Sequence, residues 1–385
     1  MKRLALGMLL LGFFFSTQIA QADWSPVKRL TWTSGPSYMP AIAIDSNSHI
    51  HVVWEDSTPF NYEIYYKQST DGGATWSGAQ RLTWTSGSSF SPALAIDTDN
   101  NPHVVWYDET PGNFEIYYKK RTDGGTTWST IKRLTWTSDT SYYPVIATDS
   151  SNVIHVVWEE GAPSSGYEIN YKRSTDGGAT WGETQRLTWT SGTSAYPAIA
   201  LDSSDTVHVV WQEHLSFSSE IYYKKSTDGG TTWSAAKRLT WTTGQVYAYD
   251  PAIAIDSGNI IHVVWSHDKP GNREIYYKKS ADGGTTWGAT QRLTWTSGES
   301  WHPAIAADSG NTIHVVWQDN TPGNDDIYYK RSTDGGATWS AAQRLTSNSG
   351  DSLIPAIAAG SGNTIHIVWY DDTSGSFEIY YIKGT

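Results

Sequence analysis

Carboxylates recur at two positions where they can bind sugars or metals. The chain holds seven segments like IHVVWED (50–56) and seven like EIYYKQS (63–69), each pair joined by a short turn-forming stretch. Paired carboxylates across such a hairpin can coordinate a hard cation, hold sugar hydroxyls or act as acid and base. Alternatively, they bond to turn backbone or indole N–H groups, or are solvated. The carboxylates that end the first segment are candidate ligand-binding residues: Asp56, Asp108, Glu160, Glu213, Asp319 and Asp371. Those that begin the second are Glu63, Glu115, Glu168, Glu220, Glu274, Asp326 and Glu378.

Aromatic residues precede a recurring proline and offer a second candidate surface. Five of the seven positions two residues before this proline are aromatic, and they are Tyr38, Phe90, Tyr142, Tyr249 and Trp301. Such rings can stack on sugars or, alternatively, fill the space between structural units. The residue directly before the proline varies: Met39, Ser91, Tyr143, Tyr196, Asp250, His302 and Ile354. We include His302 among the candidate ligand-binding residues.

A histidine begins each HVVW or HIVW segment, and six of the seven lie across a predicted hairpin from an aspartate such as Asp45 or Asp97. A His–Asp pair is typical of catalysis or metal binding. Six copies with no recurring serine or cysteine nucleophile instead indicate a structural hydrogen bond.

The elements that position these residues are short β-strands. Each repeat contains four runs rich in β-branched and aromatic residues, separated by turn signals: 40–45, 50–56, 63–69 and 76–85 in the first copy. Proline heads the first run in every copy, where a missing N–H disturbs a strand least. No segment shows a sustained helical period, so the sequence predicts an all-β fold.

A turn motif fixes the register of the repeat. STDGGATW (69–76) recurs five more times, and an aspartate followed by two glycines suits the tip of a hairpin. The pattern Ser-x-Asp-x-Gly-x-Thr-Trp resembles the Asp box, or BNR repeat, of sialidase-type β-propellers, with Arg121 in place of serine in one copy. This resemblance implies that the motif is structural and that an active site in this family lies on the opposite face. The Asp-box carboxylates are Asp71, Asp123, Asp176, Asp228, Asp282 and Asp334.

The number of repeats predicts a closed ring. The Arg-Leu that opens RLTW in the fourth run recurs every 52 to 54 residues, seven times in all. Seven units of four strands describe a seven-bladed propeller of antiparallel blades. The last unit lacks a fourth strand, whereas residues 24–33 match one and precede the first unit. We therefore expect the N-terminal strand to complete the last blade.

Composition and the N-terminus predict an exported protein. Residues 1–22 have the basic start, apolar run and A-x-A ending of a secretory signal peptide, leaving a single propeller domain at 23–385, secreted or periplasmic. Without Lys2 and Arg3, 25 basic and 39 acidic residues give a formal charge of −14. This charge disfavours nucleic acid as a partner. No later stretch predicts a membrane span. We expect the protein to be a monomer. We expect no cofactor, and calcium is the one ion that we consider.

Sialidase activity is not expected, because the chemistry that the resemblance implies needs an arginine cluster. The Arg-Ile-Pro motif of that family is absent, and seven arginines fall in the fourth strand. We call the face with the turns between second and third strands the upper face; only Arg273 falls in a loop there. Near-uniform blades suit repeated weak sites or a rigid scaffold. The leading hypothesis is a non-catalytic propeller that binds a glycan or an extracellular protein through its upper face. The alternatives are a glycoside hydrolase or lyase, with Asp108, Glu115 or Asp319 as acid and base, and a structural surface protein.

Overall fold

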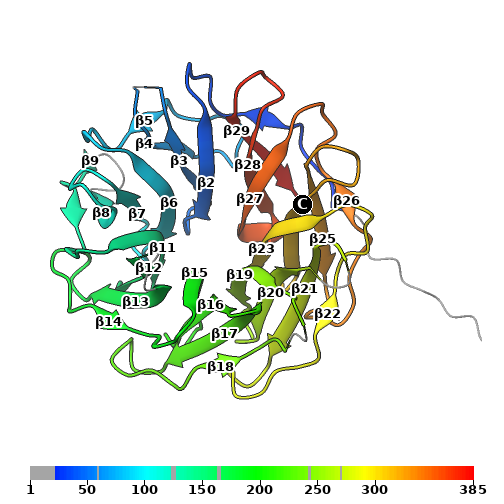
Figure 1. Ribbon diagram of the computed structural model, residues 1–385. Helices are drawn as coiled ribbons and strands as arrows, with labels where there is room; N and C mark the ends of the chain where they lie inside the picture. The colour runs from blue at the N-terminus through cyan, green and yellow to red at the C-terminus, as the bar shows by residue number, and fades with distance from the viewer. Residues whose placement is uncertain (1–21, 59, 123–126, 163–165, 242–243, 269–270) are drawn as a thin grey trace, which may run out of the picture.

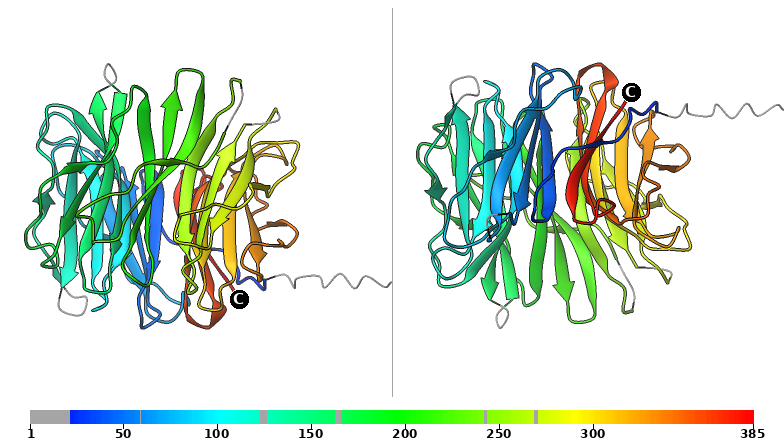
Figure 2. Two further views of the ribbon diagram at one scale, coloured as in Figure 1. Left: turned by 90° about the horizontal axis from the view of Figure 1, so that it is seen from below. Right: turned by 90° about the horizontal axis from the view of Figure 1, so that it is seen from above.

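The computed structural model describes residues 22–58, 60–122, 127–162, 166–241, 244–268 and 271–385. These residues form seven antiparallel sheets around a central axis (Figure 1). Seen from the side, the inner strands run along this axis, so the ring has two faces (Figure 2). The expected all-β, seven-bladed propeller is confirmed. The predicted signal peptide lies outside the described residues except for Ala22.

Each blade has four strands in sequence order from the axis outward. Blade 1 contains β2 (Ser37–Ile44), β3 (Ile50–Asp56), β4 (Glu63–Ser69) and β5 (Gln80–Arg81). Blade 2 contains β6 (Ser89–Ile96), β7 (Pro102–Asp108), β8 (Glu115–Thr122) and β10 (Lys132–Arg133), with β9 (Thr127–Trp128) paired to β8. Blades 3 and 4 contain β11 (Thr140–Thr148), β12 (Ile154–Ala162), β13 (Gly166–Ser174), β14 (Gln185–Arg186), β15 (Thr193–Leu201), β16 (Val207–Leu215), β17 (Ser218–Ser226) and β18 (Lys237–Arg238). Blades 5 and 6 contain β19 (Ala248–Ile255), β20 (Ile261–His267), β21 (Glu274–Ser280), β22 (Gln291–Arg292), β23 (Ser300–Ala307), β24 (Ile313–Asp319), β25 (Asp326–Ser332) and β26 (Gln343–Arg344). Blade 7 contains β27 (Ser352–Ala359), β28 (Ile365–Asp371), β29 (Glu378–Gly384) and β1 (Lys28–Arg29).

The two ends of the chain close the ring in blade 7. Strand β1 pairs antiparallel with β29, with Lys28 opposite Tyr381 and Arg29 opposite Tyr380. The Thr385 N–H also donates to the Asp23 carbonyl at 3.1 Å. The first and last strands accordingly lie side by side in Figure 1. Closure by the N-terminal strand is therefore confirmed, and it leaves no open sheet edge at the junction.

The hydrophobic core lies between blades. The second strand of each blade is almost wholly buried, and its tryptophan, such as Trp54 or Trp158, is at most 1% exposed. Each cluster joins the outer part of one blade to the inner part of the next, as Tyr118 and Leu134 of blade 2 pack with Trp158 of blade 3. Every blade is thus stabilised by two neighbours.

Each inner strand carries a β-bulge near its start. In blade 1 the register shifts between Tyr38 and Ala41, and the corresponding shift occurs in all seven blades. The residue before the proline has a φ between 45° and 51° in each case, as in Met39 and Asp250. A left-handed non-glycine residue is uncommon, and a bulge re-aims its side chain.

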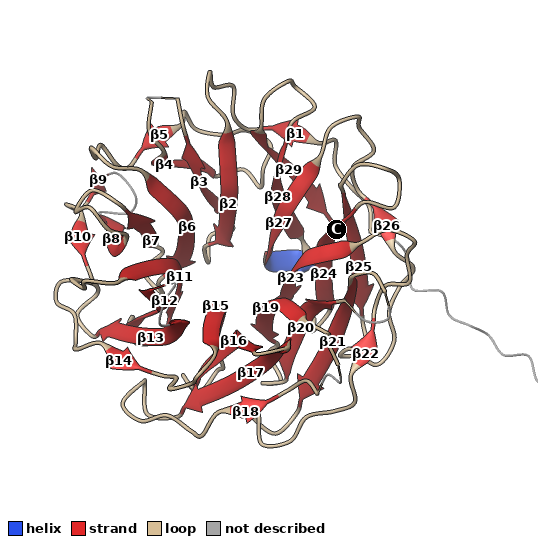
Figure 3. Cartoon of the chain, in the orientation of Figure 1, coloured by secondary structure: helices blue, strands red, loops and turns tan. Residues whose placement is uncertain are grey.

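Helical structure is nearly absent from the described residues. They contain a single turn of 3-10 helix, η1 (Ser361–Asn363), drawn as the one helix in Figure 3. No described helix has the length and apolar character needed to cross a lipid bilayer.

Candidate functional site

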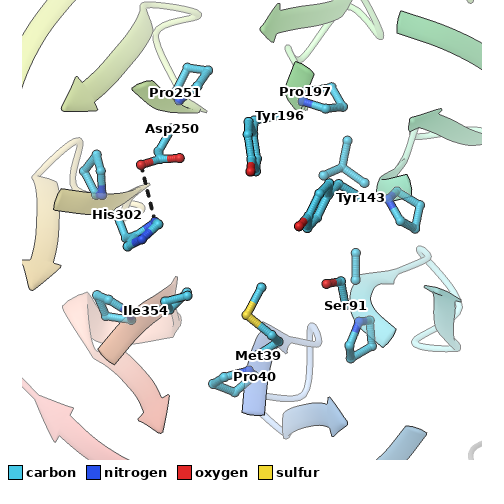
Figure 4. A pocket seen from close by; sticks show the side chains of 16 residues that line it. Met39, Pro40, Ser91, Tyr143, Tyr196, Pro197, Asp250, Pro251, His302 and Ile354 are labelled. Carbon is cyan, nitrogen blue, oxygen red and sulfur yellow. Dashed lines mark ion pairs between the residues drawn. The ribbon is translucent and has the colours of Figure 1, made fainter. Parts of the chain in front are cut away.

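A pocket of about 300 Å³ lies on the propeller axis. It is lined by the seven bulge residues and their prolines, one pair from each blade (Figure 4). Met39 is the third residue of β2, so the pocket lies toward the face where the inner strands begin. We call this the upper face; it also carries the turns between second and third strands. The pocket volume is at the lower end of the range of small-molecule sites, about 300–1,000 Å³.

The lining is chemically different on each side of the pocket. Tyr143 and Tyr196 lie together with ring centroids 5.0 Å apart. Asp250 and His302 form an ion pair with 3.4 Å between Oδ2 and Nδ1, drawn as a dashed line in Figure 4. Met39 and Ile354 supply apolar surface between these groups. An aromatic wall facing a polar pair can hold a small ring that has one apolar face and hydroxyl groups.

Two buried glutamates cap the bulges behind this lining. Glu55 Oε2 accepts the Ser91 N–H at 2.6 Å, and Glu159 Oε2 accepts the Tyr196 N–H at 2.8 Å. Burial raises the pKa of Glu55 to about 7, although the Ser91 N–H opposes this shift. Burial likewise raises the pKa of Glu159 to about 7. These carboxyl groups can therefore hold a proton near neutral pH beside the pocket.

Neutral amides occupy the same position in two other blades. Gln318 Oε1 accepts the Ile354 N–H at 2.9 Å, and Gln212 Oε1 accepts the Asp250 N–H at 3.4 Å. In these four blades the bulge N–H is therefore bonded by a charged or by a neutral side chain alike.

The predicted upper-face aromatics divide into two groups. Phe90 lies 5.0 Å from Tyr62 of the preceding blade, and Tyr142 lies 5.1 Å from Phe114, so these rings fill spaces between blades. Tyr38 has the same role against Tyr62, Tyr370 and Phe377. Tyr249 and Trp301 instead hold the Arg273 guanidinium between them, 4.4 and 4.9 Å from their ring centroids.

The predicted carboxylates at the ends of the second strands point into the blades. Asp56 and Asp108 are fully buried and accept the hydroxyls of Ser37 at 2.8 Å and Ser89 at 2.7 Å. The others have equivalent partners: Glu160 with Trp158 Nε1, Glu213 with Ser194, Asp319 with Ser300 and Asp371 with Ser352. A ligand on the upper face does not meet these groups in this structure, so we leave them out of the binding surface.

The third-strand carboxylates are equally internal. Glu63 pairs with Arg81 at 2.7 Å and Glu115 with Arg133 at 2.9 Å, and the same pair recurs in every blade. Glu115 is therefore not placed as the acid or base of a hydrolase or lyase, and neither Asp108 nor Asp319 reaches the axial pocket.

The Asp boxes form hairpin turns on the lower face. Asp71 accepts hydrogen bonds from the Ser69 hydroxyl and from the N–H and hydroxyl of Thr75, which lower its pKa to about 2. Asp176, Asp228, Asp282 and Asp334 make the same contacts, whereas Asp123 lies outside the described residues. The tryptophan of each box packs edge-on against a tyrosine of the preceding blade, as Trp181 does on Tyr118 at 5.0 Å.

The histidine–aspartate pairs have structural partners. His103 Nδ1 bonds to the Tyr118 hydroxyl at 2.8 Å and its Nε2 to Asp97 at 3.0 Å, both in the interior. No group of three or more His, Cys, Asp and Glu side chains in the described parts of the chain is placed to hold a metal ion. The expectation of no cofactor, with calcium as the one ion considered, stays a prediction.

The axial pocket contains residues that the sequence did not single out as a site. Tyr143, Tyr196 and Asp250 were noted only as variable, and Glu55 and Glu159 were not noted. The available signal was the variation before the proline in otherwise uniform blades, since departures from a repeat mark specific sites. Of the predicted ligand-binding residues, His302 lines the pocket.

Seven four-stranded blades with Asp boxes on one face define an Asp-box β-propeller. The chain belongs to the BNR repeat-like domain family, whose model matches residues 157–370. Comparison with curated protein sequences gives no match.

Solved structures with a similar fold include several carbohydrate-active enzymes. An ulvan lyase of polysaccharide lyase family PL25 has a TM-score of 0.68 and 12% identity, over 92% of this chain and 95% of that one. A Hadza microbial sialidase, Hz136, has a TM-score of 0.52 and 15% identity, over 86% and 72%. An α-L-arabinofuranosidase from Fusarium graminearum has a TM-score of 0.58 and 14% identity, over 76% and 92%. At these identities the likeness shows the fold alone.

Proposed function

We propose that this propeller binds a saccharide in the axial pocket, with Tyr143 and Tyr196 as the stacking wall and Asp250 and His302 as the hydrogen-bonding pair. The observation that carries the proposal is the ring of bulge residues: the backbone repeats sevenfold, yet the seven positions present six different side chains to the axis, with tyrosine alone occurring twice. A specific pocket on a repetitive scaffold needs this combination.

The size and chemistry of the pocket favour a sugar over an extended protein surface. A cavity of about 300 Å³, lined by the seven prolines as well as the bulge residues, admits one ring rather than a peptide helix or strand. Pyranose rings have an apolar face that suits the tyrosines and hydroxyls that suit Asp250. Arg273, held between Tyr249 and Trp301 on the upper face, adds a positive charge next to the residues that precede Asp250 and His302 in the chain.

This proposal narrows the hypothesis from the sequence. We take a glycan as the partner, and we keep Tyr249 and Trp301 of the upper face as part of the ligand-binding surface. Export by the signal peptide would bring the protein to extracellular or periplasmic glycans. The similar solved structures include enzymes that act on carbohydrates, which adds weight by analogy of fold.

Cleavage of the bound glycan is the second candidate, and Glu55 and Glu159 favour it. Their pKa values near 7 suit proton transfer at neutral pH, and both carboxyls are bonded to the bulge backbone that lines the pocket. Among the described residues, no arginine lines the pocket, so the sialidase requirement for a carboxylate-binding arginine cluster has no counterpart there.

A glycan array tests the binding proposal. Protein starting at Asp23 is applied with calcium and again with chelator, together with Tyr143→Ala, Tyr196→Ala and His302→Ala variants. Phe217→Ala is the matched control, because this ring is exposed and does not line the pocket. We expect binding to at least one saccharide, a loss of at least about tenfold for the pocket variants, and no change for the control.

Three outcomes oppose the proposal or separate the candidates. Absence of binding to every glycan rejects saccharide recognition, and binding unchanged in all three pocket variants rejects this pocket. Release of reducing ends or of an unsaturated product from a bound glycan, abolished in Glu159→Gln, would establish the second candidate.

A further inference from the structure

Six tryptophans on the outer rim are exposed although they repeat with the blades. Each belongs to an LTW segment after the outermost strand, and the exposed fraction of the residue is 65 to 69%. They are Trp32, Trp84, Trp136, Trp189, Trp241 and Trp295. The other repeated tryptophans are buried or half-buried between blades. Large exposed rings at equivalent places on a monomer mark a surface for interaction.

Three of the exposed rings border a groove between two blades, and the other three have the same arginine and lysine neighbours. At the junction of blades 7 and 1, Trp32 and Arg29 lie on one side, and Lys67, Thr75 and Trp76 lie on the other. Lys67 Nζ is 5.5 Å from the centroid of Trp32, and the Arg29 guanidinium is 5.7 Å from it. Grooves with corresponding residues surround Trp136 and Trp241, and the three have volumes of about 410 to 540 Å³.

The lysine gives each groove a positive charge without a counter-ion. Lys67 Nζ donates to the Leu30 carbonyl at 2.6 Å, and Lys119 does the same to Leu82 at 2.7 Å. Within the described residues, no carboxylate lies within 4.0 Å of these ammonium groups, whereas Arg29 is paired with Glu378. The lysines next to the six tryptophans are Lys67, Lys119, Lys172, Lys224, Lys278 and Lys330, and all but Lys330 are buried. A buried ammonium without a carboxylate partner attracts an anion, although the whole chain has a formal charge of −12.

At the seventh junction between blades, the exposed tryptophan and the lysine are both missing. Between blades 6 and 7 the tryptophan is replaced by Ser347 and the lysine by Ile382, and no Asp box follows β29. Ile382 is buried against Leu345, so this junction is closed by apolar packing. Two blades therefore pack here without the tryptophan and the lysine, which are not required for closure of the ring.

We propose that the six rim sites, each a tryptophan with its neighbouring lysine, bind an anionic polysaccharide, one sugar ring stacking on each tryptophan with its carboxylate or sulfate group toward the lysine. The sites are independent of the axial pocket. One groove gives weak binding, but a polymer that reaches several grooves on the same ring gains affinity through effective concentration. Repeated, near-identical sites suit a polymer of repeating units better than a protein partner with one interface.

Binding to immobilised polysaccharides tests the proposal. The probes are alginate, a polyuronate; carrageenan, a sulfated polymer; dextran, a neutral one; and poly(dT), a polyanion without pyranose rings. We expect binding to alginate or carrageenan that weakens with salt, and binding at least about tenfold weaker to dextran and poly(dT).

Variants locate the binding on the rim. Trp84→Ala alone should weaken binding about two- to threefold, and the triple variant with Trp136→Ala and Trp189→Ala at least about tenfold, because valency is lost. Replacing the same three residues by Phe should restore most of the affinity. Lys119→Gln, Lys172→Gln and Lys224→Gln together should remove the preference over dextran. Phe217→Ala should bind as the unaltered protein does, because this exposed ring lies outside the three rim grooves.

The melting temperature of each variant controls for folding, and exposed Trp→Ala changes should leave it within a few degrees. Equal binding to poly(dT), unaltered binding by the folded triple tryptophan variant, or no binding to either anionic polysaccharide would overturn the proposal.

Discussion

At the scale of residues, the side chain that accepts the bulge N–H determines whether the surroundings of the axial pocket change charge with pH. Glu55 and Glu159 occupy positions where blades 4 and 6 have Gln212 and Gln318, and all four side chains accept a bulge N–H. The amides show that the hydrogen bond alone suffices for the fold. The two carboxyl groups therefore add a titration that the fold does not need, which is typical of functional sites.

Glu159→Gln should stabilise the protein above neutral pH. Burial raises the folded-state pKa of Glu159 to about 7, while an unfolded glutamate has a pKa of about 4.3. Between these values the unfolded chain loses its proton first, so the contribution of this group to stability is full below about pH 4 and is lost as pH rises to 7. The variant should gain on the order of 2–3 kcal/mol at pH 8 and nothing at pH 4.

Urea denaturation at pH 4, 6 and 8 measures this difference. The exposed Glu183→Gln serves as the control for removal of one negative charge. A Glu159→Gln stability difference that does not change with pH would show that Glu159 is ionised in the folded protein throughout.

At the scale of elements, the Asp box acts as an inter-blade contact as much as a turn. Its second glycine lies against a tyrosine hydroxyl of the preceding blade, as Gly178 does against Tyr118, whose ring also packs on Trp181. The Ser174 hydroxyl accepts the Gly178 N–H at 2.8 Å and donates to Asp176. The motif thus fixes the turn and the adjacent tyrosine together.

Two neighbouring glycines of this turn separate backbone strain from packing. Gly177 and Gly178 both have positive φ, 63° and 85°, so alanine is strained at either position. At Gly178 an added methyl would overlap Tyr118 Oη, whereas at Gly177 the nearest atom is Lys120 Nζ at 3.4 Å. We expect Gly177→Ala to cost about 1 kcal/mol and Gly178→Ala about 2–4 kcal/mol in chemical denaturation. Equal costs would mean that the tyrosine moves aside freely.

The elements were predictable from the sequence to different degrees. The strands, the Asp-box turns and the inter-blade tryptophans follow from period and turn chemistry, which repeat seven times and reinforce one another. The axial pocket does not, because its lining depends on the bulge between residues such as Tyr38 and Ala41. Regular alternation gives no sign of which of Tyr38 and Met39 faces the axis, and it led us to favour the residue two before the proline.

The exposure of the rim tryptophans was also beyond the sequence. Tryptophans repeat at the same places from blade to blade, and only the packing of neighbouring blades distinguishes Trp54, which is buried, from Trp32, which is exposed. The sequence also left open whether the second-strand carboxylates bind turn backbone or solvent. Asp56 instead accepts a hydrogen bond from the Ser37 hydroxyl, which belongs to another strand.

At the scale of the whole molecule, circular closure makes each blade depend on the others. The seven hydrophobic clusters each join two blades, and the cluster between blades 7 and 1 includes Leu30, directly after β1, with Trp54 and Tyr381. Blade 7 is the one blade assembled from both ends of the chain, so its strand pairing is held without a covalent link between its outer strand and its neighbours in the sheet. We expect unfolding to begin at this junction.

Removing the closing strand should therefore destabilise the entire ring. A chain that starts at Leu30 loses the pairing of Lys28 and Arg29 with β29, and it leaves Glu378 without its arginine partner. Glu378 is fully buried, and an unpaired buried carboxylate costs about 3–5 kcal/mol. We expect a single transition at a melting temperature several degrees below that of a chain starting at Asp23.

Arg133→Ala, which breaks the equivalent pair with Glu115 inside blade 2, is the matched control. Because that strand stays tethered on both sides, hydrogen exchange should then increase mainly near blade 2, whereas the shortened chain should exchange faster in blades 7, 1 and 6. Equal melting temperatures for the chains starting at Leu30 and Asp23 would show that closure contributes little and that the inter-blade clusters alone hold the ring.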